Sequence, residues 1–241
     1  MNAQEAQNIK WSENIIIADG DYIDHVAFDI IVNFERMLDR RIPAADFSQW
    51  AVDVALDGRL KPGNHETQVV LLHDKKNLKL ENFAPSDYEK ELNGQAFRDG
   101  HLGEFIINSI ATGDEHTAKD AVLLDLLKTL CNHEEVKRIM IVPNAEDASL
   151  LNSIRSTFRD VDDELKHITL FAMQPIEGGN FKQAILGCSI MHAMGINGIE
   201  ASPSPSEGGD VPGRARLGTV ACGRKAIKFL IEKGRRVSLY L

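Results

Sequence analysis

The stretch that decides the fold is "NIIIADGDYIDH", Asn14–His25, in which an apolar run leads directly into Asp19-Gly20-Asp21. Isoleucine favours strands, and a short apolar run that ends at a glycine is typical of a strand buried on both faces. The apolar residues that follow keep the spacing of one helix face as far as residue 40, and Pro43 comes just after this pattern stops. We therefore expect a strand over 14–18 and a helix over 23–40, with two carboxylates where they meet.

The same alternation of strand and helix patterns continues along the chain. Further strands are expected over 67–73, 103–110, 136–144 and 167–173, and further helices over 117–132, 145–158 and 181–194. The polar segment 74–99 is expected to be an inserted loop or hairpin. Helices of this length between short apolar strands are typical of crossover βαβ units. The sequence therefore predicts an α/β fold, a three-layer sandwich with a mainly parallel central sheet.

Length and composition fit a globular protein: 241 residues with 43% hydrophobic side chains are enough for a substantial core. No apolar run approaches the ~20 residues of a membrane helix, and the N-terminal residues lack the layout of a secretory signal. The three cysteines lie far apart, with no CxxC pair. We expect a cytoplasmic protein with reduced thiols, no zinc site and no membrane contact.

Charge is distributed unevenly between the two ends of the chain. The net charge of −9 argues against a surface that coats nucleic acid, yet residues 201–241 hold eight basic and only three acidic side chains. A stretch rich in Ser, Pro and Gly, Ala201–Gly213, precedes all eight of these basic residues. We expect an α/β domain over 1–200, a linker or mobile loop over 201–213, and a basic extension over 214–241. The extension is expected to form a helix and then a strand, and pairing of that strand with a second copy would give a homo-oligomer.

Several carboxylates follow predicted strands, and these strands all end at one edge of a parallel sheet. Carboxylates that converge need a cation or raised pKa values, and oxygen ligands suit Mg²⁺ or Mn²⁺. The candidate ligands are Asp19, Asp21, Asp120 and Asp147, with Asn144, Glu146, Asp125 and His116 as accessory candidates. Each also has a plain structural reading, because Asp and Asn cap helices and an acid in the first turn complements the helix dipole.

Three stretches together resemble the PIN-like nucleases, and most closely their NYN branch. The stretches are "IIIADGDYIDH", "HTAKDAVLLDLL" and "RIMIVPNAEDASLLNSIR", and their order and approximate spacing match that family from about Asn14 to Met173. The sequence departs from the family pattern at Tyr22, where the family usually has Asn. It departs again in the third stretch, where Pro143-Asn144 replaces Ser-Gly and Ala145 falls where an Asp is expected.

The resemblance implies that Asp19, Asp120 and Asp147 hold a divalent ion, Mg²⁺ or Mn²⁺, that activates water for attack on single-stranded RNA. Asp21 is then an outer partner or a second ligand. A non-catalytic binding or scaffold protein on the same fold is the main alternative, favoured by Ala145 and by the acidic surface. A haloacid-dehalogenase-like phosphatase is the other alternative, with Asp19 as nucleophile and Asp21 as general acid. In that family a threonine is expected where this chain has Ile23.

Overall fold

A seven-stranded sheet forms the centre of the computed structural model, which describes residues 10–113, 118–162 and 164–196, and the backbone alone of 216–222, 225–231 and 237–240. Its strands are β1 (Asn14–Asp19), β3 (His65–Asp74), β5 (Ala96–Asp99), β6 (Gly103–Thr112), β7 (Arg138–Val142), β8 (His167–Ala172) and β9 (Lys182–Ile185). They lie in the order β5-β6-β3-β1-β7-β8-β9, and every neighbouring pair is parallel except β5 and β6. The predicted α/β class with a mainly parallel sheet is confirmed.

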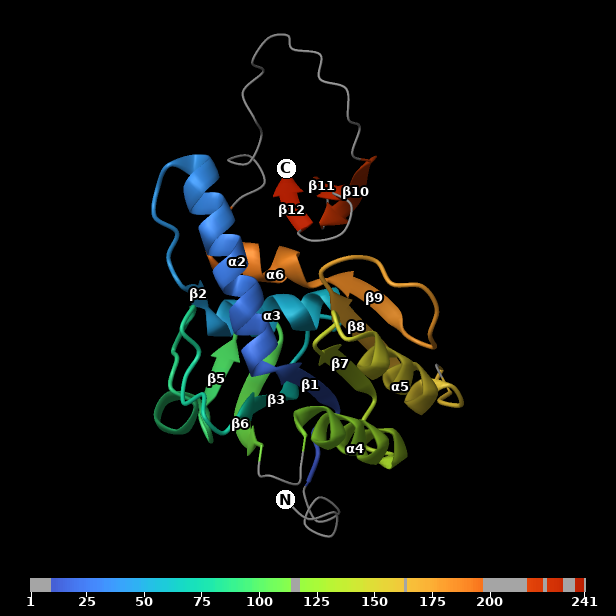
Figure 1. Ribbon diagram of the computed structural model, residues 1–241. Helices are drawn as coiled ribbons and strands as arrows, with labels where there is room; N and C mark the ends of the chain where they lie inside the picture. Colours follow the sequence, from blue (N-terminus) through green and yellow to red (C-terminus); the bar gives the residue numbers. More distant parts are fainter. Residues whose placement is uncertain are drawn as a thin grey trace.

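Helices cover both faces of this sheet (Figure 1). The helices α2 (Gly20–Leu38), α3 (Phe47–Asp57) and α6 (Leu186–Ala193) pack on one face, and α4 (Lys119–Asn132) and α5 (Ala148–Phe158) pack on the other. Strand β1 contributes to both apolar layers: Ile16 and Ala18 belong to the first, and Ile15 and Ile17 to the second. This two-sided burial explains why β1 is a continuous apolar run rather than an alternating one.

Two segments of this body differ from the prediction. The helix expected over 181–194 begins as strand β9, because residues 182–185 pair with β8 and so satisfy the backbone groups of that strand. Helix α3 was not predicted at all. The polar segment after β3 contains only the short strand β4 (Phe83–Ala84), which pairs with β2 (Ala45–Asp46), a π-helical turn at Tyr88–Leu92, and β5.

The prediction of a helix in the C-terminal extension is wrong. The backbone instead forms three antiparallel strands in the order β10-β11-β12, with bounds β10 (Arg216–Cys222), β11 (Lys225–Ile231) and β12 (Val237–Tyr240). The segment "KAIKFLI" is rich in β-branched and aromatic residues, and pairing on both sides of β11 satisfies its backbone groups. The expected terminal strand is confirmed as β12, while the expected linker at 201–213 lies outside the described residues.

The structure bears on two of the expectations about membranes and thiols. In the described part of the chain, no helix is both long and apolar enough to cross a membrane. Cys131 is free, as expected. The expectation of a reduced thiol is wrong for Cys188, which is disulfide-bonded, because separation along the sequence does not measure distance in the fold.

Candidate functional site

The candidate site lies at the point where the strand order of the sheet reverses. From β1 the chain passes through α2 and α3 to β3 on one side, and it reaches β7 on the other side through α4, which covers the opposite face (Figure 1). In open α/β sheets such a reversal leaves a crevice at the carboxyl ends of the strands. The end of β1, the beginning of α4 and the turn after β7 therefore meet at one edge.

Asp19 is the last residue of β1 and the N-cap residue of α2. Its side chain is almost fully buried, and its Oδ1 accepts the backbone N–H of Tyr22 at 3.0 Å, which caps the helix. The same Oδ1 accepts a charge-assisted hydrogen bond from the Lys119 Nζ at 2.7 Å. Burial raises the pKa of Asp19 above its ordinary value, and the Lys119 ammonium only partly offsets this effect.

Asp21 accepts three donors. Its Oδ2 accepts the Lys119 Nζ at 2.7 Å and the backbone N–H of Asp74 at 2.8 Å, and its Oδ1 accepts the Asn77 Nδ2 at 2.7 Å. Burial favours a raised pKa, but these donors together lower the pKa of Asp21 below its ordinary value. Asp21 thus fastens the turn after β3 to the beginning of α2, and its oxygens are already engaged.

Lys119 is the first residue of α4 and joins the two carboxylates. Its side chain is 23% exposed, compared with 4% for Asp19 and 22% for Asp21. Burial alone favours a lowered pKa, but the two carboxylates raise the pKa of Lys119 above its ordinary value and keep the ammonium charged. Asp19, Asp21 and Lys119 are called the ion cluster below.

The other candidate ligands form a second group beside the ion cluster. Asp120 follows Lys119, and burial and the charge of Asp147 raise its pKa, while Lys119 opposes them. Asp147 caps α5, because its Oδ1 accepts the backbone N–H groups of Ser149 at 2.7 Å and Leu150 at 3.2 Å. The fold thus brings Asp120 and Asp147 within electrostatic range of each other, and Asp147 also has the capping role that its position allows.

The accessory candidates divide between the edge and the surface. Asn144 accepts the backbone N–H of Glu146 at 3.2 Å and so shapes the turn after β7. Glu146 is exposed, and its negative charge helps to raise the pKa of the Tyr22 hydroxyl. Asp125 is exposed further along α4, where it pairs with Lys128 at 3.4 Å. His116 lies outside the described residues.

Two tyrosine hydroxyls are buried beside the ion cluster. Tyr22 and Tyr88 are 5% and 1% exposed, and neither hydroxyl has a hydrogen-bond partner among the residues that the structure describes. Burial and nearby carboxylates, including Asp19 in both cases, raise the pKa of each phenol. The Tyr88 ring stacks on His73, and a Cβ at Gly20 would collide with its hydroxyl. Gly20 is therefore required by the close approach of this ring.

The side chains at this edge do not fit the predicted metal centre as they are arranged. Over 10–113, 118–162 and 164–196, no three His, Cys, Asp or Glu side chains lie close enough together to hold a metal ion. The four predicted ligands form two pairs, Asp19 with Asp21 and Asp120 with Asp147, and the cation between the first two is the Lys119 ammonium. Sequence reasoning placed Lys119 in a motif but gave it no role. Its position directly before Asp120 was the available signal.

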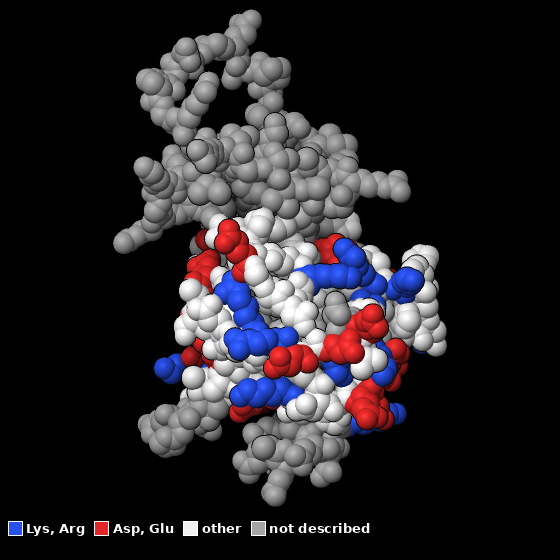
Figure 2. Space-filling view, turned by 90° about the vertical axis from the view of Figure 1, so that its right-hand side faces the viewer, with Lys and Arg blue, Asp and Glu red and all other residues white. Residues whose placement is uncertain are grey.

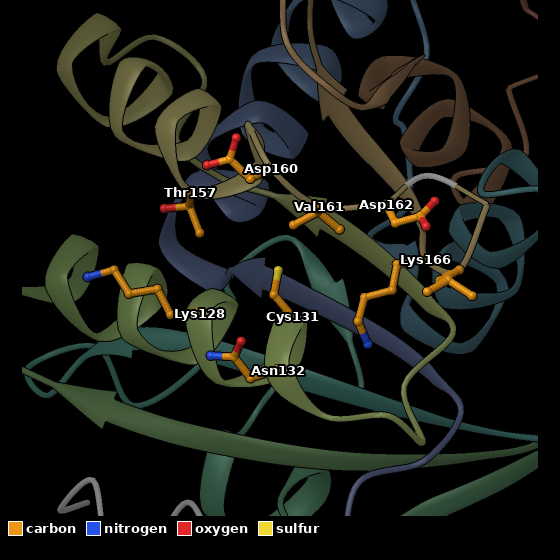
Figure 3. Close-up of a pocket in the computed structure, with 9 residues that line it drawn as sticks. Lys128, Cys131, Asn132, Thr157, Asp160, Val161, Asp162 and Lys166 are labelled. Carbon is orange, nitrogen blue, oxygen red and sulfur yellow. The ribbon is translucent and has the colours of Figure 1, made fainter.

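Away from this edge, a hollow of about 380 Å³ lies at the opposite ends of α4 and α5 (Figure 3). Cys131 faces this hollow, and burial raises the pKa of its thiol to about 11, so the thiol is neutral at physiological pH. The Lys166 ammonium is held by the carbonyl oxygens of His133 and Val136 at 2.5 and 2.7 Å. The hollow thus offers no thiolate, and its two lysines have partners, Lys166 in these carbonyl oxygens and Lys128 in Asp125 at 3.4 Å. It is nevertheless large enough for a small molecule. Its lining residues are Lys128, Cys131, Asn132, Thr157, Asp160, Val161, Asp162, Leu165 and Lys166.

Comparison with known proteins places the chain in a family without assigning it an activity. The model of a family of unknown function (DUF6621) matches residues 8–201, so the chain belongs to this family. Neither the curated proteins nor the solved structures contain a match.

Proposed function

We propose that this protein is a PIN/NYN-like module that binds a partner without cleaving it. The PIN/NYN-like assignment is supported by the order in which the chain supplies its polar groups to one edge. Asp19 comes from the end of β1, Asp120 from the beginning of α4 and Asp147 from the turn after β7. The three stretches that carry the sequence resemblance thus meet at the reversal of the sheet order, where ligands bind in folds of this kind.

The observation that carries the non-catalytic proposal is the position of the Lys119 Nζ, 2.7 Å from both Asp19 Oδ1 and Asp21 Oδ2. Metal-assisted hydrolysis needs open coordination positions for water and substrate. In the ion cluster an ammonium lies between the carboxylates, and Asp21 already accepts two further donors. The cluster is therefore satisfied by groups of the protein itself.

The charge at this edge also favours a partner other than RNA. Among the described residues, five carboxylates lie near the Lys119 ammonium, namely Asp19, Asp21, Asp120, Glu146 and Asp147. Without a metal ion, such an edge repels the phosphates of RNA. Figure 2 shows another side of the molecule, the right-hand side of Figure 1, and there too the described residues form no uniformly basic surface, because acidic and basic side chains are interspersed. Tracking a single strand calls for a positively charged groove instead.

The phosphatase alternative requires a carboxylic acid that donates a proton to the leaving group. A general acid needs a pKa near the working pH. Asp21 has the opposite environment, because the three groups that donate to it lower its pKa. Lys119 does supply a cation beside Asp19, as a phosphate site requires, but burial raises the pKa of that carboxylate and makes it a weaker candidate for ionised nucleophile.

The test is cleavage of single-stranded RNA and of an aryl phosphate, each with Mg²⁺ or Mn²⁺, by the wild type, Asp19→Asn and Asp125→Asn. Asp125 is a matched control, because it is an exposed carboxylate on α4 that pairs with Lys128. We expect the wild type and both variants to share one background rate on both substrates. RNA cleavage that Asp19→Asn abolishes and Asp125→Asn retains would overturn the proposal and establish the ribonuclease.

The proposed partner surface includes the C-terminal sheet. Strand β12 is an outer strand of the order β10-β11-β12, and outer strands can pair with another chain. A homo-oligomer formed in this way predicts that light scattering gives a multiple of the 26.7 kDa chain mass. Replacement of Ser238 by proline, which removes one backbone donor of β12, should then give the single-chain mass. If Ser238→Pro has the same multiple mass as the wild type, or if the wild type itself has the single-chain mass, pairing through β12 is excluded.

A further inference from the structure

Asp19 and Asp21 lie one residue apart at the end of a buried strand, and two carboxylates in such a position need a positive charge between them. The chain meets this need from a residue about one hundred positions away. The Lys119 Nζ is at hydrogen-bond distance from one oxygen of each carboxylate, 2.7 Å in both cases. The ammonium therefore occupies the place between the carboxylates that a bound cation would take.

The position of Lys119 is fixed by the fold as well as by its charge. It is the first residue of α4, a helix held to the sheet by Leu123, Leu127 and Leu130 in the second apolar layer. Asp19 is fixed in turn by the cap of α2, and Asp21 by its contacts with Asp74 and Asn77. A metal ion that entered between these carboxylates would have to break both charge-assisted hydrogen bonds of the ammonium.

We infer that Lys119 takes the place of a divalent cation in this protein, and that its removal exposes a latent cation site made by Asp19 and Asp21. This inference deepens the proposed non-catalytic function, because it states why the site works without a metal. Mg²⁺ keeps several of its waters and usually takes only one or two carboxylates from a protein, with phosphate oxygens as further ligands. The latent site has the two carboxylates of Asp19 and Asp21, and water takes the remaining coordination positions. The wild-type protein keeps this site closed.

An independent observation indicates a place for such waters. The hydroxyls of Tyr22 and Tyr88 are buried beside the ion cluster and have no protein partner in the described part of the chain. The Tyr88 hydroxyl lies against Gly20, the residue between the two carboxylates. Buried hydroxyls ordinarily have a partner, and the waters of a bound cation would supply partners to these two.

The experiment is a Mn²⁺ titration of the full chain. Binding is measured by calorimetry and by the electron paramagnetic resonance signal of free Mn²⁺. Lys119→Met removes the ammonium and keeps most of the side-chain stem. We expect Lys119→Met to bind one Mn²⁺ at least about tenfold more tightly than the wild type, a difference of about 1.4 kcal/mol. Lys119→Met combined with Asp19→Asn should lose this binding. Lys128→Met, an exposed lysine on the same helix, should match the wild type.

Two outcomes would overturn the inference: equal Mn²⁺ affinity in the wild type and Lys119→Met, or no saturable binding by a folded Lys119→Met. If Lys119→Met does not fold, the inference is tested by the melting temperature of the wild type with and without Mn²⁺. In that case Mn²⁺ must leave the melting temperature of the wild type unchanged, and a rise that Asp19→Asn abolishes would refute the inference. Metal-independent turnover of the aryl phosphate would sink the proposed function and leave the Mn²⁺ result intact, so the two failures can be told apart.

Discussion

Lys119→Met should destabilise the protein by much more than other lysine substitutions on α4. Removal of one partner of a fully buried ion pair costs about 3–5 kcal/mol, because the remaining charge is buried and uncompensated. In the ion cluster the Asp19 side chain is only 4% exposed, but Asp21 and Lys119 are 22% and 23% exposed. Solvent therefore screens part of the loss, and we expect about 2–3 kcal/mol. For a chain of this length that corresponds to a fall in melting temperature of about 4–12 °C.

Urea unfolding followed by circular dichroism measures this loss, and Lys128→Met is the matched control. The Lys128 side chain is 61% exposed and pairs with Asp125 at 3.4 Å, so its removal should change the free energy of unfolding by less than about 0.5 kcal/mol. Adding Asp19→Asn to Lys119→Met should recover part of the loss, because it removes the uncompensated carboxylate. Equal urea midpoints for Lys119→Met and Lys128→Met would show that the Lys119 ammonium does not stabilise the fold through the ion cluster.

Three further predictions follow from single contacts. Gly20→Ala should lower stability by about 1–3 kcal/mol in urea unfolding, because the new methyl group collides with the Tyr88 hydroxyl. Tyr88→Phe in the same chain should restore part of this loss, and no restoration would argue against the collision. Asp147→Ala should cost about 1 kcal/mol through loss of the α5 cap, and Asp147→Ser should cost less; equal losses in thermal melts would argue against the capping role. Partial desolvation by the surrounding protein atoms and the charge of Asp53 raise the pKa of Asp57 to about 6, so the folded chain holds this proton more tightly than the unfolded chain between pH 3.8 and about 6. Stability from this group should fall as the pH rises through that window, and Asp57→Asn should remove the fall; the effect should be small because Asp57 is exposed. Melting curves of both proteins at pH 4 and pH 7.5 measure it, and parallel shifts would contradict the assignment.

The central sheet could be predicted because its strands are apolar on both faces. A run such as Ile15–Ala18 is unusual outside the centre of a parallel sheet, and the helical spacing after it fixes the connection. The beginning of α2 was placed three residues too late. The apolar pattern starts at Ile23, but the Asp19 cap allows the helix to begin at Gly20.

Helix α3 was missed although the sequence contains its signals. Asp46 accepts the backbone N–H of Gln49 and caps the helix, and Phe47, Trp50 and Val54 follow at the spacing of one buried face. A search for a cap followed by a helical period would have found it. The C-terminal segment is a different case, because a short run such as "AIKFLI" fits a helix and a strand equally well, and pairing with β10 and β12 decides between them.

The position of the candidate site could be predicted from the sequence, but the group that lies between its carboxylates could not. The order of the strands determines that Asp19, Asp120 and Asp147 come to one edge. Which side chain lies between Asp19 and Asp21 depends on the direction of Lys119 at the first turn of α4, and spacing along the sequence does not contain that information. The contact of Asp21 with Asn77 comes from a loop without periodic pattern, so it was equally hidden.

The most direct test of the account is anomalous diffraction at the manganese edge from crystals of the wild-type protein soaked in MnCl₂. We expect the Lys119 Nζ to lie between Asp19 and Asp21, at hydrogen-bond distance from both, and no anomalous peak to occur there. A manganese peak between these two carboxylates, with the Lys119 side chain displaced, would contradict it.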